Sequence, residues 1–424
     1  MPERYYQGAL ALGATHERAV FLTVVPAAKS GIMAGIVLGI GRAIGETMAV
    51  IMVAGNQARM PKGIFQGIRT LTANIVIEMG YATDLHREAL IATGVVLFVF
   101  ILIINTLFSI LKRKEVLIME NVKAAMENAG SAGKAEAINY QSVKQKFQSY
   151  LKHPGSFAVY ILTSLAALIT VLVLGFIIVY ILVKGVPHLT PDLFAWEYNS
   201  ENVSMLPSII NTLLLTALAL VIVVPIGIFS AIYMVEYAKK GNKIVSIVRV
   251  TAETLSGIPS IVYGLFGMIF FVGVCHFGNS LLAGALTVAI MVLPTVMRTT
   301  EEALISVPNS YREGSFGLGA GKLRTVFKVV LPSAVPGILS GIILATGRIV
   351  GETAALIYTA GTVAKVPESV FDSTRTLAVH MYNLSKEGLN TNQAYATAVV
   401  LLIVVILINM LSNFAARKLS AKQK

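Results

Sequence analysis

Charge and cysteine are both scarce in this sequence. Only 13% of its 424 residues are charged, whereas 55% are hydrophobic, and the mean hydropathy is +0.74. A chain of this composition is too apolar for a water-soluble fold and belongs in a lipid bilayer. The single cysteine, Cys275, excludes an intramolecular disulfide and a cysteine-based metal site, so no metal is expected.

A nucleotide-binding loop and a cleavable leader are also missing. The sequence contains no GxxxxGK[ST] stretch, so the chain cannot cradle nucleotide phosphates itself, and no cofactor is expected. The first apolar stretch begins near residue 31 and follows a polar opening with Arg4, Glu17 and Lys29, which differs from a signal peptide. Met1 is therefore expected to lie in the cytoplasm.

Long apolar stretches dominate what is present. A membrane-spanning helix needs about 20 largely apolar residues. Eight such stretches lie near 31–54, 89–111, 157–183, 207–235, 249–273, 281–305, 337–360 and 394–414. The sequence therefore predicts an all-α integral membrane protein with about eight transmembrane helices.

The basic residues predict the orientation of these helices. Most of them fall in segments 1–30, 112–152, 236–248, 306–334 and 415–424. Basic residues in short loops resist translocation, so these segments and both termini are expected on the cytoplasmic side of a multi-pass inner-membrane protein. The other loops, 55–88, 184–206, 274–280 and 361–393, are expected on the outer side. The net charge of +12 then follows from topology and from attraction to membrane lipid, and it requires no nucleic-acid partner.

An internal repeat divides the chain. Residues 5–50 align with 311–356 without a gap, nearly half of the pairs are identical, and the matches include Gly, Pro, Arg, Glu and Thr. Four apolar stretches, from 157–183 to 281–305, lie directly before the second copy, but none lies before the first. We therefore expect a truncated module at 1–112, a cytoplasmic linker at 113–155 and a complete six-helix module at 156–424. The missing helices are expected from an upstream segment or from an intact second subunit.

Each copy places charges in the middle of an apolar stretch, where a charge costs about 3 kcal/mol on insertion scales and so tends to face a pathway or a partner. The spacing of i and i+4 sets an arginine and a glutamate on one helical face, where each can neutralise the other. A guanidinium suits bidentate contact with phosphate oxygens, and the carboxylate can accept a hydrogen bond from a protonated phosphate but not from sulfate. A salt bridge that locks two modules together is the structural alternative. The residues are Arg42, Glu46 and Thr47 in the first copy and Arg348, Glu352 and Thr353 in the second.

The segment before each charged helix resembles a known family signature. Glu313, Gly314, Ser315, Gly319 and Pro332 stand at the spacing of the "EAA" motif of ABC importer permeases. The resemblance implies a type I ABC importer permease fold, with a short cytoplasmic coupling helix that docks on a separate ATPase dimer. Gly319 is expected to permit a tight turn after this short helix, and Pro332 is expected to help end it before the next membrane helix. An amphipathic interfacial helix is the alternative. The first copy carries Gly13 but has Gln7 at the leading acidic position, which departs from the family.

The motif G-R-x-x-G-E-T after an EAA-type loop resembles the phosphate-specific permeases of the Pst family, and segments 253–264 and 293–301 are similar to that family as well. The resemblance implies the non-enzymatic permease of an ATP-driven phosphate importer that works with an extracytoplasmic phosphate-binding protein. Arg298 is a further candidate for the substrate pathway, with snorkelling to the interface as its alternative. A permease for sulfate or molybdate and a truncated, non-transporting product remain open.

Overall fold

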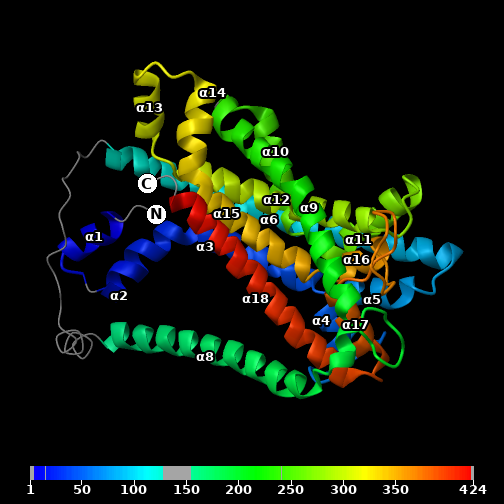
Figure 1. The fold of residues 1–424 in the computed structure, drawn as a ribbon. Coiled ribbons are helices and arrows are strands. Elements are labelled where there is room, and N and C mark those ends of the chain that lie inside the picture. Colours follow the sequence, from blue (N-terminus) through cyan, green and yellow to red (C-terminus); the bar gives the residue numbers. More distant parts are fainter. Residues whose placement is uncertain (1–3, 15, 128–153, 240, 422–424) are drawn as a thin grey trace. The chain divides into compact units, whose positions relative to one another are not determined.

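The computed structural model describes residues 4–14, 16–127, 154–239 and 241–421. The described residues form helices and no β-strand. They divide into two compact units, one formed by residues 1–40 and 103–180 and the other by residues 41–102 and 181–424 (Figure 1). This confirms the predicted all-α class.

The first unit contains the N-terminal helices and the chain around the linker. It holds α1 (Arg4–Ala11), α2 (His16–Ala19), the π-helical η1 (Val20–Val24) and the start of α3 (Val25–Gly45). The end of α6 (Asp84–Glu127) and most of α8 (Pro154–Gly185) complete it.

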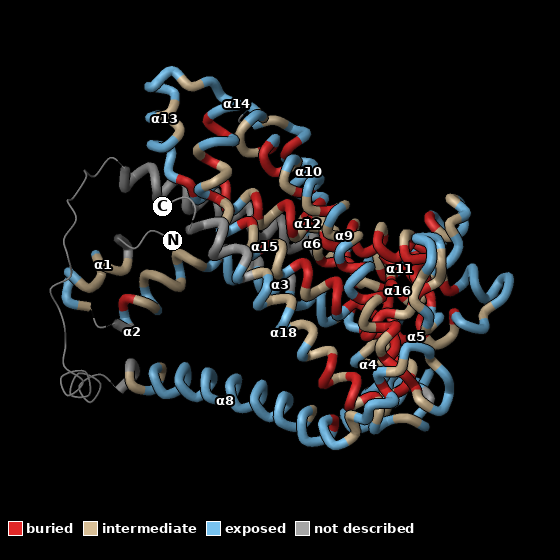
Figure 2. The backbone as a smooth tube through the Cα atoms, in the orientation of Figure 1, coloured by how far each residue is buried: buried red, intermediate tan, exposed pale blue. Residues whose placement is uncertain are grey.

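The second unit is built around three long helices. These are α9 (Leu206–Ile232), α12 (Leu281–Ser306) and α15 (Leu331–Val350), and their apolar side chains enclose a core that includes Leu215 and Met291. Buried residues concentrate around α11, α12 and α16, the red segments of Figure 2. The shorter elements are α4 (Met48–Val53), α5 (Leu71–Met79), η2 (Val186–His188), η3 (Pro191–Phe194), η4 (Tyr233–Tyr237), α10 (Lys243–Ser256), α11 (Ser260–Gly267), η5 (Met268–Val274), α13 (Asn309–Gly317), α14 (Lys322–Thr325), η6 (Val326–Val330), α16 (Ala354–Thr359), α17 (Leu377–Glu387) and α18 (Thr391–Ala421).

Six helices of the described chain are long and apolar enough to cross a membrane, and a bent pair would make seven. The pair is α10 with α11 and η5, which bend by 105°. The predicted span at 249–273 is therefore not one straight helix but either a broken span or a re-entrant loop. Pro259 explains the bend, since its ring and missing N–H do not fit a helix interior. Thr254 and Ser256 donate to the carbonyls of Val250 and Glu253 before the bend, at 2.9 and 2.8 Å.

The two copies of the repeat fold alike at the same offset. Gly13 and Gly319 both adopt positive φ, at 82° and 80°, directly after α1 and α13. A five-residue π-helix follows in each copy, η1 in the first and η6 in the second. The long helix after it ends before a six-residue helix, α4 or α16. The two copies therefore have the same local backbone structure.

The structural repeat continues beyond the aligned residues into the two predicted outer loops, 55–88 and 361–393. Arg69 Nε donates to the carbonyl of Asn56 at 3.0 Å, and Arg375 Nε donates to the equivalent carbonyl of Thr362 at 2.6 Å. Thr70 and Thr376 then cap α5 and α17 in the same way. Sequence analysis missed these arginines, although extending the alignment would have paired them.

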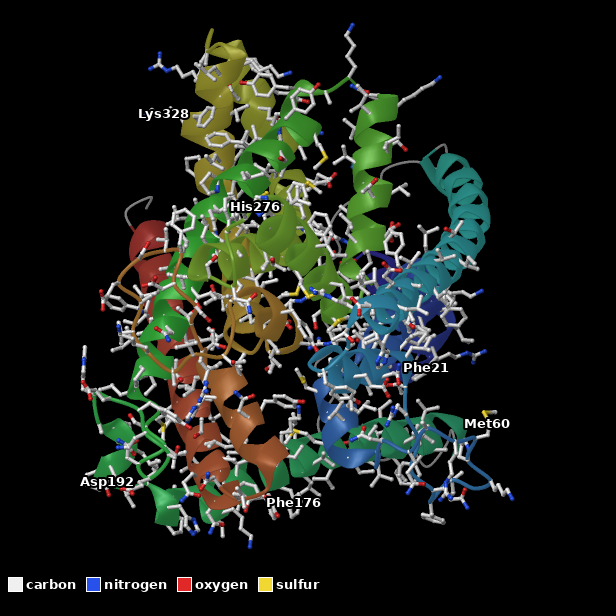
Figure 3. All side chains as sticks on the ribbon, turned by 90° about the vertical axis from the view of Figure 1, so that its right-hand side faces the viewer. Phe21, Met60, Phe176, Asp192, His276 and Lys328 are labelled. Carbon is white, nitrogen blue, oxygen red and sulfur yellow. The ribbon has the colours of Figure 1, made fainter. Side chains whose placement is uncertain are left out.

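The second unit separates basic and acidic segments. Lys328 and Asp192 lie at opposite ends of this unit in Figure 3. Lys328 belongs to η6, and Asp192 belongs to η3 in the loop before α9. Segments 306–334 and 184–206, for which we predicted opposite membrane sides, are therefore also at opposite ends of the unit.

Candidate functional site

Both charged motifs interrupt their spans. In the second copy α15 ends at Val350 and α16 begins at Ala354, and in the first copy α3 ends at Gly45 and α4 begins at Met48. Each motif glutamate therefore lies in a break between two helices, where backbone groups lack helical partners.

The glutamates bond to the backbone at these breaks. Glu46 Oε1 accepts the N–H of Ala49 at 3.2 Å, and Glu352 Oε1 accepts the N–H of Ala355 at 3.1 Å. Each carboxylate thus accepts a backbone N–H in the first turn of the helix that follows it, where the N–H groups lack helical partners. The threonine hydroxyls next in the motif donate to the carbonyls two residues earlier, at 3.0 Å in the first copy and 3.4 Å in the second.

This geometry corrects the predicted pairing of charges. Among the described ion pairs, none within 4.0 Å joins Arg42 to Glu46 or Arg348 to Glu352. The i,i+4 rule assumes one continuous helix, but the helix ends between the two residues of each pair. Neither guanidinium takes part in any of the described ion pairs.

Both motifs meet at the turn before α11. A Cβ on Gly45 would lie 2.9 Å from Pro259 Cγ, so the first motif packs directly on this proline. The hydroxyl of Ser260 lies beside the Glu352 carboxylate, and Arg348 lies close to Glu352. Two consecutive residues of one turn thus contact both motifs.

The two motifs differ in exposure. Glu352 and Thr353 are buried, with 8% and 9% of their surface exposed, and Arg348 is half-buried. Arg42 and Glu46 are exposed. Thr47 is buried, because its hydroxyl turns back to the carbonyl of Gly45.

Arg298 lies apart from this turn in sequence and pairs within its own helix. Its Nε donates to Glu302 Oε1 at 3.1 Å, one turn along α12, and both side chains are largely exposed. On the same helix Glu301 pairs with Arg249 of α10 at 2.5 Å.

The second EAA-type segment forms a separate short helix, α13, between α12 and the helix that starts at Lys322. Glu313, Gly314 and Gly319 are exposed, and Phe316 and Leu318 expose 47% and 91% of their surface. A face that combines an acid, small residues and large apolar side chains is suited to a protein partner.

An ion pair that sequence analysis missed holds α13 in place. Arg312 Nη2 lies 2.6 Å from Glu236 Oε1 of η4 and 2.9 Å from the carbonyl of Leu304, and its Nη1 donates to the carbonyl of Val307 at 2.8 Å. The two side chains are only 15% and 9% exposed. The hydroxyls of Ser315 and Thr325 add a 2.9 Å contact between α13 and α14. The one sequence signal was that Arg312 has no counterpart at Tyr6.

The structure corrects the role of Pro332. We expected this proline to help end the short helix, but it lies in the first turn of α15, and residues 322–350 form one continuous helix. Proline is tolerated in a first helical turn, where its missing N–H has no helical partner. In the first copy Pro26 has the same place in α3, Gln7 is half-buried on α1, and Gly13 is exposed in the turn.

These features describe a membrane protein with interrupted spans and an exposed short helix between two of them. The model of the family "Binding-protein-dependent transport system inner membrane component" matches residues 1–116 and 223–424. The chain belongs to this family, the multi-pass permeases of ABC importers, and the expected type I permease class is confirmed. Permeases of this family are not themselves catalytic and work with an ATPase and a binding protein.

Similar proteins carry related names. The chain is 33% identical to the "Probable ABC transporter permease protein YqgI" of Bacillus subtilis, over 59% of this chain and 90% of that one. It is 34% identical to the "Phosphate transport system permease protein PstA 1" of Mycobacterium tuberculosis, over 47% and 66%. A solved ABC transporter for alginate import shares 16% identity with a TM-score of 0.47, over 64% of this chain and 99% of that one.

Proposed function

We propose that the chain is the permease of an ATP-driven importer of inorganic phosphate, with both termini in the cytoplasm of a cell whose inner membrane it spans. The observation that carries the proposal is the pair of GRxxGET motifs that meet at the Pro259–Ser260 turn. Several similar proteins named as phosphate permeases support the substrate.

The chemistry of the site favours a protonated tetrahedral anion. Arg348 supplies a planar guanidinium that can hold two oxygens, and it has no acid within ion-pair distance among the described residues. Glu352 can accept a hydrogen bond from a hydroxyl of phosphate, which a sulfate ion lacks. Arg42, Glu46 and Thr47 provide the same groups from the first copy, and Thr353 adds a hydroxyl.

The proposed organisation has two permease modules and one coupling helix in each. The family model matches the two stretches 1–116 and 223–424, which supports one module at 1–112 joined through 113–155 to a second module at 156–424. Glu313, Gly314 and Gly319 contact the ATPase dimer, and α13 transmits its closure to the membrane helices. Alternating access then carries the anion past the paired arginines.

Reconstitution in liposomes with the ATPase and the phosphate-binding protein tests this function. We expect phosphate uptake and phosphate-stimulated ATP hydrolysis, and a loss of uptake on the order of 100-fold in Arg42→Ala or Arg348→Ala at unchanged membrane insertion. Lysine at either position restores the charge but not the planar fork, so rescue should be partial. Uptake of sulfate or molybdate instead, or unchanged uptake in both alanine variants, would contradict the assignment.

A further inference from the structure

The arginines that hold the two predicted outer loops have different partners in the two copies. In the first copy Arg69 forms an ion pair with Glu78. At the offset of the repeat, Arg375 replaces Arg69 and Leu384 replaces Glu78. Leucine carries no charge, so Arg375 lacks the acid that neutralises its counterpart.

The acids of the second outer loop do not replace this partner. Glu368 pairs with Lys365 at 2.9 Å, and Asp372 accepts the backbone N–H groups of residues 368 and 369 at 2.8 and 2.9 Å. Among the ion pairs of the described residues, none includes Arg375. Its charge is therefore not neutralised by a described acid within 4.0 Å.

Three contacts hold the Arg375 guanidinium in one orientation. Its Nε donates to the carbonyl of Thr362, its Nη1 lies 3.4 Å from Nδ1 of His380, and its Cζ lies over the ring of Tyr198, 5.0 Å from the centroid. The rings of His380 and Tyr198 also meet edge to face, with centroids 6.0 Å apart. A guanidinium that is already oriented loses little freedom when it binds an anion.

Part of this guanidinium remains free to bind. Nη1 has a second N–H beyond the one directed at His380, and neither described hydrogen bond of Arg375 to a neighbour uses Nη2. Arg375 is half-buried, whereas His380 is fully buried behind it. The pKa of His380 is lowered to about 4, so its ring is neutral at pH 7 and adds no second charge.

The guanidinium lies beyond the outer end of the helix that begins at the second charged motif. Glu352 lies just before α16, and Thr362, which holds Arg375, lies three residues after α16 ends. A mostly helical segment of this length places the two sites on the order of 15 Å apart. In the proposed topology, an anion that enters from the outer side would therefore meet Arg375 before it meets Arg348.

We propose that Arg375 binds a tetrahedral oxyanion at the outer end of α16, with Tyr198 and His380 as positioning residues. Nη1 and Nη2 can donate two parallel hydrogen bonds to two oxygens of such an anion. The inference rests on the proposed function for the identity of the anion, which is inorganic phosphate. The site is separate from the two GRxxGET motifs and would hold phosphate before it reaches them.

His380 provides a local probe of binding, because its Nδ1 lies beside Arg375. The measurement is nitrogen NMR of the purified chain with isotopically labelled histidine at neutral pH, and the signal that is missing in His380→Asn identifies this residue. We expect inorganic phosphate to shift the signal in a saturable way, and sodium chloride at equal ionic strength to leave it unchanged. No shift with phosphate, or an equal shift with chloride, would overturn the inference.

Variants locate the bound anion. Arg375→Gln removes the charge but keeps an N–H donor for the carbonyl of Thr362, and we expect it to weaken phosphate binding by about tenfold or more. Arg375→Lys keeps the charge without the planar fork and should bind with intermediate affinity. Lys365→Gln removes the same charge from an exposed position of the same loop and is the matched control. Wild-type affinity in Arg375→Gln would overturn the site.

A further variant and transport separate this inference from the proposed function. The phosphate shift should persist in Arg348→Ala, and its loss there would overturn a separate outer site. A phosphate shift in a chain that does not import phosphate would contradict the proposed function and leave the anion site in place. Normal phosphate uptake by a chain that shows no shift would overturn the outer site alone.

Discussion

The two copies of the repeat have the same backbone plan but differ in how the short helix before the span is held. In the second copy Arg312 joins α13 to Glu236, and Ser315 joins it to Thr325. The first copy has Tyr6, Ala9 and Ala19 at the positions of Arg312, Ser315 and Thr325, and these side chains cannot form the same ion pair or hydroxyl pair.

The difference separates what is needed to form the segment from what is needed to transmit force through it. A positive-φ glycine, a π-helix and a first-turn proline occur in both copies and are enough to shape the turn. The buried ion pair occurs in the second copy, where it ties α13 to the ends of α9 and α12. We therefore expect the second copy to be the stronger mechanical link to an ATPase.

The largest effect is expected when the second copy is made to resemble the first at this link. Arg312→Tyr leaves Glu236 buried without its partner, and breaking a buried pair costs about 3–5 kcal/mol. We expect ATP hydrolysis to continue in the reconstituted transporter while uptake falls by at least tenfold. Arg324→Tyr, at an exposed arginine of α14, is the control. Equal ratios of uptake to hydrolysis in the two variants would refute the link.

The outer loop offers the next comparison, at a buried histidine. Burial and the nearby Arg375 guanidinium lower the pKa of His380 from 6.5 to about 4, and its first-copy counterpart is Asn74. The folded state therefore favours the neutral ring, and its stability falls as pH drops from about 6.5 towards 4. The loss of unfolding free energy approaches about 3 kcal/mol over that window.

Melting temperatures of the purified wild type and His380→Asn, measured from pH 7.5 to 4, test this comparison. Acidic groups common to both proteins cancel in the difference. We expect the wild type to lose more stability than the variant on acidification. Parallel curves would mean that His380 does not titrate between the folded and unfolded states.

Gly319 provides a smaller comparison within the coupling segment. Proline requires φ near −65°, whereas Gly319 has φ of 80°, and its N–H also donates to the carbonyl of Phe316 at 2.9 Å. Strain of this kind costs about 1–3 kcal/mol. We expect Gly319→Pro to reduce co-purification with the ATPase, with Gly317→Ala as the control in the same segment. Wild-type retention with normal transport would show that this loop is not the docking element.

Sequence alone predicted the class, most spans and the repeat, because each depends on local composition or on fixed spacing. It also located the charged motifs and the positive-φ turn at Gly319. It predicted neither the bend within 249–273 nor the separation of each arginine from its glutamate, because apolar length does not reveal that a helix stops before Pro259 or between Arg348 and Glu352. The Arg312–Glu236 pair could not be predicted from the sequence, since tertiary packing brings together two residues that are far apart in the chain.

The smallest expected effect tests whether the copies are equivalent where their contacts match. The hydroxyls of Thr70 and Thr376 accept the N–H groups of Ala73 and Val379, at 3.2 and 3.5 Å, at the starts of α5 and α17. Replacing an N-cap threonine with alanine costs about 1 kcal/mol, so Thr70→Ala and Thr376→Ala should increase amide exchange in α5 and α17 by similar factors.

The control is Thr163→Ala, because that exposed hydroxyl bonds within α8 and caps no helix. Hydrogen exchange measured by mass spectrometry resolves the two capped helices separately. A much larger increase in amide exchange in α17 than in α5 would mean that burial of Thr376, which is 2% exposed, matters more than the shared cap. The local equivalence of the copies would then end at the outer loop, and the caps would have to be explained by the packing around each one.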